Sequence, residues 1–214
     1  AYYSYLGNDR PTDNQEKSST QLGSMFGPAW SEDELKAFLE TAKISHEQFK
    51  SLDERNKSIA SFLKNGKVIG LFQGRTEFGP RALGSRSIIG DARNKDMQAI
   101  LNLKIKFRES FRPFAPAILY EKVSEFFELN QESPYMMLVA KVNKDKRKFS
   151  KKIQSEDMLK IVKEIRSEIP AITHVDYSAR IQTVDKKNNS SLYAIIKEFE
   201  NQTNCPLIIN TSFN

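Results

Sequence analysis

The chain has 214 residues, a formal net charge of +6, one cysteine and two histidines. A single cysteine excludes a disulfide framework and a four-thiolate zinc site, and two histidines in dissimilar segments exclude a histidine-rich metal site. No stretch resembles a signal peptide or a transmembrane helix, so we expect a cytoplasmic protein without a membrane partner. The positive charge favours anionic ligands such as nucleotides, phosphates or RNA, without choosing among them.

The N-terminal part is a polar lead-in. Its first thirty residues are rich in Asn, Asp, Ser, Gly and Pro, which predicts loops. Ser31 and Glu34 have the spacing of a capping box, so a short helix should begin there and reach about residue 42. We therefore assign residues 1–50 to a lead-in or linker with one short helix, and residues 51–214 to one folded domain.

Helices and strands interleave along the rest of the chain. The segment GKVIGLFQ predicts a buried strand over residues 68–72, and Pro116 predicts that the strand over residues 114–119 is irregular or at a sheet edge. Cys205, beside Pro206, is expected to be a buried small hydrophobe. The other expected helices cover residues 52–63, 95–107, 123–129, 152–168 and 192–200, and the other strands cover residues 135–142, 180–184 and 207–209. This interleaving indicates an α/β or α+β fold.

The most informative segment is residues 74–88, GRTEFGPRALGSRSI. Arg75, Arg81 and Arg86 are interleaved with three glycines, directly after an expected strand. Arginine offers a planar fork of donors for phosphate or carboxylate oxygens, and glycine lets backbone N–H groups turn toward an anion. The segment predicts an anion site, and we expect the anion to be phosphate. The alternative is a basic surface loop whose arginines pair with nearby acids.

A second basic segment covers residues 102–116, NLKIKFRESFRPFAP. Lys106 and Arg112 could converge on one pocket while Phe107, Phe111 and Phe114 anchor the loop. Basic residues at a helix end also complement the helix dipole, which suffices to explain Lys104. We assign a functional role to Arg112.

Two polar segments follow near the C-terminus. In residues 172–183, ITHVDYSARIQT, His174 and Asp176 lie on one face if the segment is extended, and His174 could donate a hydrogen bond to a phosphate or carbonyl oxygen. In residues 210–214, NTSFN, Asn210 and Ser212 could contact phosphate, although a plain turn at the strand end explains them equally well.

Candidate cations thus outnumber candidate bases, which besides His174 are Glu77, Asp91 and Asp176. This balance suits a reaction that neutralises phosphate charge, such as phosphoryl or nucleotidyl transfer. The sequence has no GxxxxGK[ST] and no GxGxxG, so the common nucleotide-binding folds are not indicated.

These four segments, in this order, resemble the C-terminal region of the NodU/CmcH-type O-carbamoyltransferases, and LGSMFGPAWSEDELKAFLE resembles the segment that precedes it. The resemblance covers roughly residues 22–214. It implies an α/β fold with a YrdC-like twisted, mostly mixed sheet and flanking helices. It also implies a module that binds ATP, with Mg²⁺ on the nucleotide, and carbamoyl phosphate, and that forms carbamoyl-adenylate. A separate N-terminal Kae1-like domain with a histidine-bound transition metal would then pass the carbamoyl group to a hydroxyl.

The resemblance also implies roles for individual residues. The basic residues that bind anions in the family correspond to Lys106, Arg112 and Arg180, with His174 as a neighbouring catalytic candidate. Arg75, Arg81, Arg86, Asn210 and Ser212 are the remaining substrate- and nucleotide-binding candidates. No metal ligand is expected in this chain.

The sequence departs from the family's pattern in three places. It lacks the Kae1-like domain, it ends at NTSFN, where the family continues and the fold is therefore expected to be truncated, and Tyr177 stands where the family has glycine. Two other functions stay open: an RNA- or nucleotide-binding YrdC-like module without catalysis, and an inactive scaffold for the other domain. We favour the enzyme and do not expect nucleic acid as a partner, because the motif arginines lie among Gly, Pro and Phe and not in solvated runs.

Overall fold

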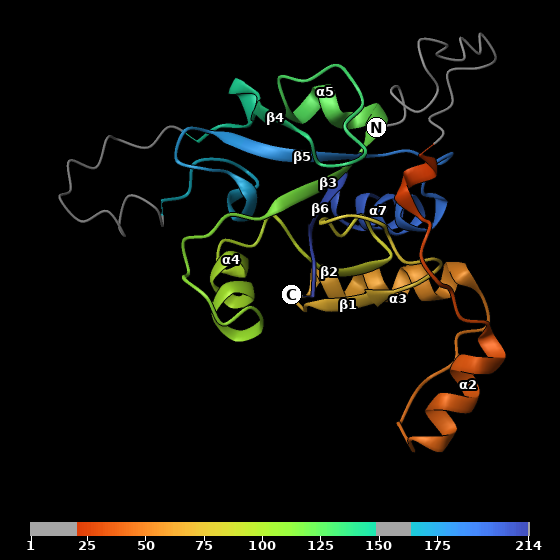
Figure 1. The fold of residues 1–214 in the computed structure, drawn as a ribbon. Coiled ribbons are helices and arrows are strands. Elements are labelled where there is room, and N and C mark those ends of the chain that lie inside the picture. Colours follow the sequence, from red (N-terminus) through yellow and green to blue (C-terminus); the bar gives the residue numbers. More distant parts are fainter. Residues whose placement is uncertain (1–20, 149–163, 214) are drawn as a thin grey trace, which may run out of the picture.

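The structure is a computed structural model, and it describes residues 21–148 and 164–213. Six strands form one open mixed sheet in the order β1-β2-β6-β3-β5-β4 (Figure 1). The strands are β1 (Ile69–Phe72), β2 (Arg86–Gly90), β3 (Ala115–Leu119), β4 (Leu138–Lys141), β5 (Ser178–Val184) and β6 (Leu207–Thr211). Only β3 and β5 run parallel among these neighbouring pairs. The expected mixed α/β class is confirmed.

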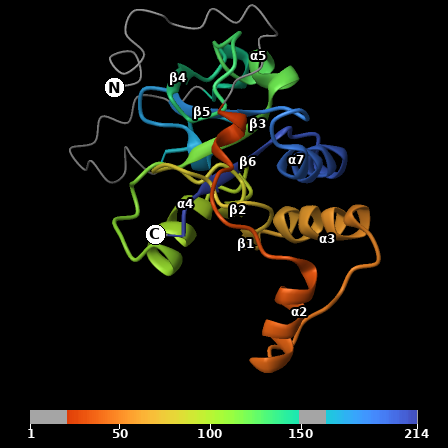
Figure 2. The same ribbon diagram turned by 45° about the vertical axis from the view of Figure 1, so that its right-hand side comes forward.

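Helices lie on both sides of this sheet. The α-helices among the described residues are α2 (Glu32–Thr41), α3 (Leu52–Lys64), α4 (Met97–Ile100), α5 (Val123–Phe126) and α7 (Ser190–Thr203). Helices α3 and α7 lie side by side, and α4 lies across the sheet from them (Figures 1 and 2). Helix α4 continues into one π-helical turn, η2 (Leu101–Ile105).

The first two helices begin and end as their sequences predict. The Ser31 side chain accepts a hydrogen bond from the Glu34 N–H at 3.2 Å, and Glu34 Oε2 accepts one from the Ser31 N–H at 2.7 Å, which completes the capping box. Gly66, with φ 74°, follows the end of α3 in the left-handed region. Helix α2 buries no side chain and stands away from the sheet (Figure 2). The expected division of the chain into a lead-in, residues 1–50, and a folded domain, residues 51–214, stays a prediction.

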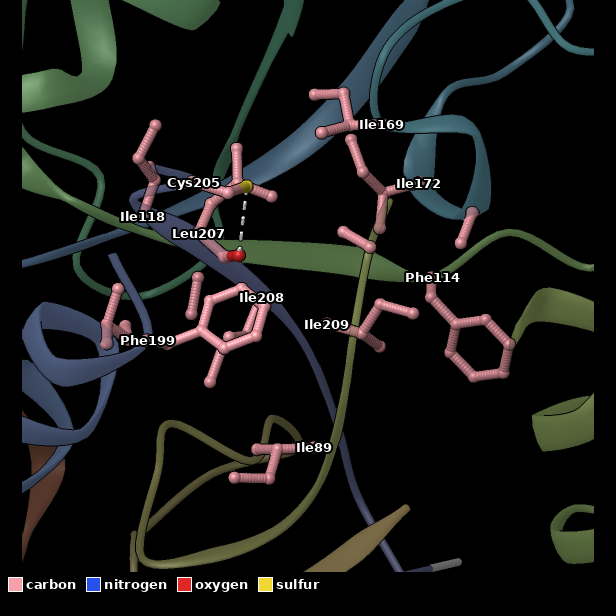
Figure 3. Packing of buried hydrophobic residues seen from close by; sticks show 14 of the residues in the cluster. Ile89, Phe114, Ile118, Ile169, Ile172, Phe199, Cys205, Leu207, Ile208 and Ile209 are labelled. Carbon is pink, nitrogen blue, oxygen red and sulfur yellow. Dashed lines mark hydrogen bonds between the residues drawn. The ribbon is translucent and has the colours of Figure 1, made fainter. Parts of the chain in front are cut away.

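The core is built around the central strands β3 and β6. Figure 3 shows Ile118 of β3 and Leu207, Ile208 and Ile209 of β6 packed with the side chains around them, and all four are fully buried. Cys205 lies beside them with its Sγ 3.6 Å from the Leu207 carbonyl oxygen. Burial raises the pKa of this thiol to about 12, so Cys205 is an inert core residue, as expected.

The prediction of an irregular or edge strand around Pro116 is wrong, because β3 is central and pairs with both β6 and β5. The Leu119 N–H donates to the opposed Pro206 carbonyl, so alternation along the antiparallel ladder puts Pro116 at a non-hydrogen-bonded position toward β6. Its imide nitrogen faces β5, where pairing begins only at Ala117. A central strand therefore accommodates this proline without losing a ladder bond.

Two other expectations need correction. Strand β1 is an edge strand and not a buried one: Phe72 is 52% exposed. Of the helix expected over residues 152–168, the part up to residue 163 lies outside the described residues, and residues 164–168 are not helical. There, Ser167 instead forms an isolated antiparallel bridge with Arg147.

Two glycines of the loop between β1 and β2, which is rich in arginine, give a matched test of its packing. Gly84 (φ 114°) and Gly79 (φ 124°) both have positive φ, so alanine is strained at either position. A Cβ on Gly84 would lie 2.5 Å from Leu192 Cδ2, whereas a Cβ on Gly79 would meet no heavy atom within 4 Å. We expect Gly84→Ala to lower the free energy of unfolding in urea by about 1–3 kcal/mol more than Gly79→Ala. Equal losses would contradict tight packing of the loop on α7.

Candidate functional site

The four sequence motifs meet at one end of the central strands. Because β3 is antiparallel to β6 and parallel to β5, the start of β3, the start of β5 and the end of β6 lie together. Ala115 is opposite Asn210, and the pairing of Ala117 with Gln182 places Arg180 beside Ala115 on the other side. Arg180, Ala115 and Asn210 thus form a row across three strands, with the smallest side chain in the middle.

The arginine-rich loop (residues 74–86, which ends on the first residue of β2) is fixed above this row by hydrogen bonds. Asn210 Nδ2 donates to the Ala82 carbonyl at 3.0 Å, and Gln182 Nε2 donates to the Leu83 carbonyl at 2.9 Å. From within the loop, Glu77 Oε1 accepts from three backbone N–H groups, at distances of 2.7–3.1 Å. The loop is therefore held to the sheet and cannot be treated as a free surface turn.

Loop and strands enclose a cavity of about 250 Å³, here called the arginine cavity. Its wall contains Met136 and residues from every motif: 80–82, Arg108, 113–115, Arg180 and 210–212. Three of these residues are arginines, and none is an aspartate or glutamate. Such a wall favours an anion.

None of the three cavity arginines forms an ion pair among the described residues. Within residues 21–148 and 164–213, neither Arg81 nor Arg180 has an ion pair, and the Nε of Arg180 is buried without a hydrogen-bond partner. Burial lowers the pKa of Arg180, and the neighbouring positive charge of Arg81 lowers it further. A half-buried cation beside another cation is costly, and an anionic ligand relieves that cost.

Arg108 is a site residue that the sequence reasoning did not select. Its Nε donates to Asn102 Oδ1 at 2.7 Å, and its guanidinium lies 5.0 Å from the centre of the Phe114 ring. Its position between the two selected residues of the same motif, Lys106 and Arg112, was the available signal.

Lys106 reaches the arginine cavity indirectly. Its Nζ donates to the backbone carbonyl of Ser212, and Ser212 lines the cavity. Burial lowers the pKa of Lys106, and the positive charge of Arg108 adds to that effect. This contact ties the second motif to the fourth.

Arg112 lies outside the cavity wall. Its Nε is 2.8 Å from Glu109 Oε2, and its side chain is about half exposed. The expected anchoring by aromatic residues holds only for Phe114, which is 4% exposed, because Phe107 is 85% and Phe111 49% exposed. Lys106 and Arg112 therefore do not share one pocket in this structure.

The other arginines of the loop bind backbone carbonyls. Arg75 donates to the Phe26 carbonyl at 3.1 Å. Arg86 donates to the carbonyls of Gln73 at 2.8 Å and Gly74 at 3.1 Å, and its guanidinium stacks 3.6 Å from the Phe72 ring centre. Arg86 also lines a second cavity of about 300 Å³ that adjoins the first at Arg81 and Ser212. The alternative, in which the loop arginines pair with acids, does not hold among the described residues.

His174 borders a separate cavity of about 210 Å³. It stands at the start of a tight turn, in which Tyr177 has φ 66°, a conformation that glycine adopts more readily than tyrosine. Burial lowers the pKa of His174, while Asp176 raises it and Arg180 lowers it. His174 therefore lies near Arg180 but does not line the arginine cavity.

The three carboxylates considered as bases are all engaged in structural contacts. Glu77 holds the loop, Asp91 forms a 2.7 Å ion pair with Arg93, and Asp176 accepts from the Ser178 hydroxyl at 2.7 Å. In the described part of the chain, no group of three His, Cys, Asp or Glu residues could hold a metal ion. Likewise, none of its helices has both the length and the apolar character needed to cross a bilayer.

Comparison with known proteins places this site in a family. The model of the family described as "Carbamoyltransferase C-terminus" matches residues 60–214. An uncharacterized protein of Synechocystis sp. is 46% identical over 217 residues, 100% of this chain and 34% of its own length. Nodulation protein NolO of Bradyrhizobium diazoefficiens is 38% identical over 88% of this chain and 32% of its own length. Nodulation protein U of Sinorhizobium fredii is 35% identical over 73% of this chain and 24% of its own length.

The chain thus spans about a third or less of the length of these relatives. The relatives extend well beyond the part that is similar to this chain. The match covers all four motifs that meet at the arginine cavity.

The lowered pKa of His174 predicts a pH dependence of stability. Because the pKa in the folded state lies below the ordinary value of 6.5, the unfolded chain takes up this proton first. The contribution of His174 is complete above that value and is lost as the pH falls through the folded-state pKa. We expect His174→Gln to reduce the loss of unfolding free energy between about pH 7.5 and pH 5, measured by urea denaturation. Identical pH profiles for the two proteins would contradict the burial of His174.

Proposed function

This chain belongs to the carbamoyltransferase C-terminus family, and from that premise we propose that it forms carbamoyl-adenylate from ATP and carbamoyl phosphate, as one module of an ATP-dependent O-carbamoyltransferase. The family supports the carbamoyltransferase role. The identities of the two substrates are our proposal.

One observation carries the proposal: Arg81 and Arg180 face one cavity without an acidic partner among the described residues. Guanidinium groups recognise phosphate through paired N–H donors. A structural role would have been served better by an ion pair. The arrangement is therefore suited to a ligand that brings its own negative charge.

The proposed chemistry requires charge neutralisation more than proton transfer. Water first hydrolyses carbamoyl phosphate to carbamate and inorganic phosphate. A carbamate oxygen then bonds to the α-phosphorus of ATP, while the bond from that phosphorus to pyrophosphate breaks. Negative charge collects on the departing phosphates, where Arg81, Arg108 and Arg180 would stabilise it. Mg²⁺ would arrive with the ATP phosphates, since the cavity wall offers no carboxylate to hold it.

The proposal includes a second module. Transfer of the carbamoyl group to a hydroxyl would take place on an N-terminal domain of the full-length protein, in keeping with the greater length of the relatives. A transition metal would belong to that domain. A cytoplasmic location is part of the proposal, because ATP is available there.

A role in RNA binding is less well supported. It calls for an exposed basic stripe, and the best candidate is the lysine-rich run of residues 141–152. In its described part, Lys146 lies 3.7 Å from Glu168, and Arg147 forms a 2.8 Å ion pair with Glu128. These contacts reduce the charge that the run could offer to a phosphate backbone.

An exchange assay tests the proposed half-reaction. We expect this chain to move labelled pyrophosphate into ATP only when carbamoyl phosphate is present, because the adenylate must form before its synthesis can be reversed. Without the N-terminal domain it should carbamoylate no hydroxyl acceptor. Efficient carbamoylation by the isolated chain would contradict the division between modules, and exchange without carbamoyl phosphate would contradict the identity of the substrate.

Arg180 and Arg112 provide a matched pair of variants. Arg180→Gln removes an unpaired charge from the cavity, whereas Arg112→Gln removes a half-exposed ion pair outside it. We expect the first to weaken phosphate or ATP binding by about 1.5–3 kcal/mol and the second by less than about 1 kcal/mol, measured by calorimetry. The reverse order would move the anion site to Arg112. A steep salt dependence of RNA binding that survives Arg180→Gln would favour the RNA function instead.

A further inference from the structure

Two residues in the wall of the arginine cavity each carry a buried polar atom that has no hydrogen-bond partner among the described residues. Asn210 is 1% exposed, and its Oδ1 has no hydrogen-bond partner among the described residues. The Nε of Arg180 is also buried and has no hydrogen-bond partner among the described residues. Buried polar atoms without partners are rare in native proteins, so a pair of them in one cavity wall indicates a ligand. One is an acceptor and the other a donor.

The orientation of the Asn210 amide is determined by its neighbours. Nδ2 donates to the Ala82 carbonyl at 3.0 Å and to Gln182 Oε1 at 2.6 Å. A backbone carbonyl only accepts, so Nδ2 must face Ala82. Gln182 is oriented in the same way, because its Nε2 donates to the Leu83 carbonyl at 2.9 Å. Reversing the Asn210 amide would direct Oδ1 against a carbonyl oxygen, so Oδ1 is the unpaired atom.

We propose that Asn210 Oδ1 accepts a hydrogen bond from the amino group of the carbamoyl substrate and thereby selects a carbamoyl group over an acyl group. This inference rests on the proposed function. A carbamoyl group has an N–H donor beside a carbonyl acceptor, which is the complement of Asn210 Oδ1 and Arg180 Nε. An acetyl group puts a methyl where the amino group would be and leaves Oδ1 unpaired.

The row across the three strands explains how one small molecule could contact both residues. Asn210 on β6 and Arg180 on β5 flank Ala115 on β3, so their backbones are about 10 Å apart, two strand spacings. Ala115 leaves room between the two side chains, and both line the cavity. A bound carbamoyl group there has its phosphate near Arg81 and Arg108, which line the same cavity.

Two stable phosphonates isolate the amino group as the variable. Phosphonoacetamide and 2-oxopropylphosphonate share the carbonyl and the phosphonate, and differ only in carrying NH₂ or CH₃. We expect the wild-type chain to bind phosphonoacetamide about tenfold more tightly in calorimetry, because the methyl compound leaves a buried acceptor unpaired. Asn210→Leu should bring this ratio close to one.

A matched control separates recognition from the structural role of Asn210. Gln182→Met breaks the same amide network but retains Asn210 Oδ1, so both compounds should weaken together and the tenfold ratio should persist. If Asn210→Leu does not fold, as judged by circular dichroism, Asn210→Ala, which also lacks a side-chain acceptor, is measured in its place.

Each outcome bears on a different claim. A wild-type ratio near one, or a tenfold ratio that survives the Asn210 substitution, overturns the role of Asn210 while the anion site stands. Loss of the ratio in Gln182→Met as well would assign the selectivity to the network and not to Oδ1, which also overturns it. Failure of the wild-type chain to bind either phosphonate would count against the proposed function itself.

Discussion

The site depends on the attachment of the arginine-rich loop to β5 and to the end of β6. Side-chain amides from Gln182 and Asn210 bind the carbonyls of Leu83 and Ala82, and Glu77 binds three N–H groups of the same stretch. These bonds satisfy backbone groups that would otherwise be buried without partners. They also bring Arg81 close to Arg180. Without this attachment the motifs would be neighbours in the sheet, but they would not share a cavity.

This arrangement leaves part of the molecule less stable than it could be. Arg180 is half-buried next to another cation, and Asn210 Oδ1 has no partner in the described part of the chain. Both features oppose folding by amounts comparable to an average mutation. Elsewhere in the described part of the chain, side chains cap the N-termini of α2, α3 and α7, and one large cluster of buried side chains forms most of the core. A local cost within a consistent structure is typical of a ligand site.

Residues that one motif contains can have quite different roles. In the loop, Arg81 lines the cavity, whereas Arg75 and Arg86 hold backbone carbonyls. In the second motif, Arg108 lines the cavity, whereas Arg112 pairs with Glu109. Neighbouring residues in a loop point in different directions, and the backbone path decides which of them meets a distant strand. The four motifs therefore come together at one cavity, but only some of the residues selected within them line it, and their roles in binding or catalysis stay predictions.

The sequence alone determined the features that arise from local chemistry: the capping box at Ser31, the left-handed end of α3 at Gly66, and a set of cation-rich segments whose chemistry suits an anion. It could not determine the place of Pro116, because a proline in a central strand depends on where the ladder with the next strand begins. Nor could it determine that Asn210 and Arg180 flank Ala115, since that row exists only once β3 pairs with β6 on one side and β5 on the other. Strand order and register are set by the packing of the whole sheet, and they decided which side chains share the cavity.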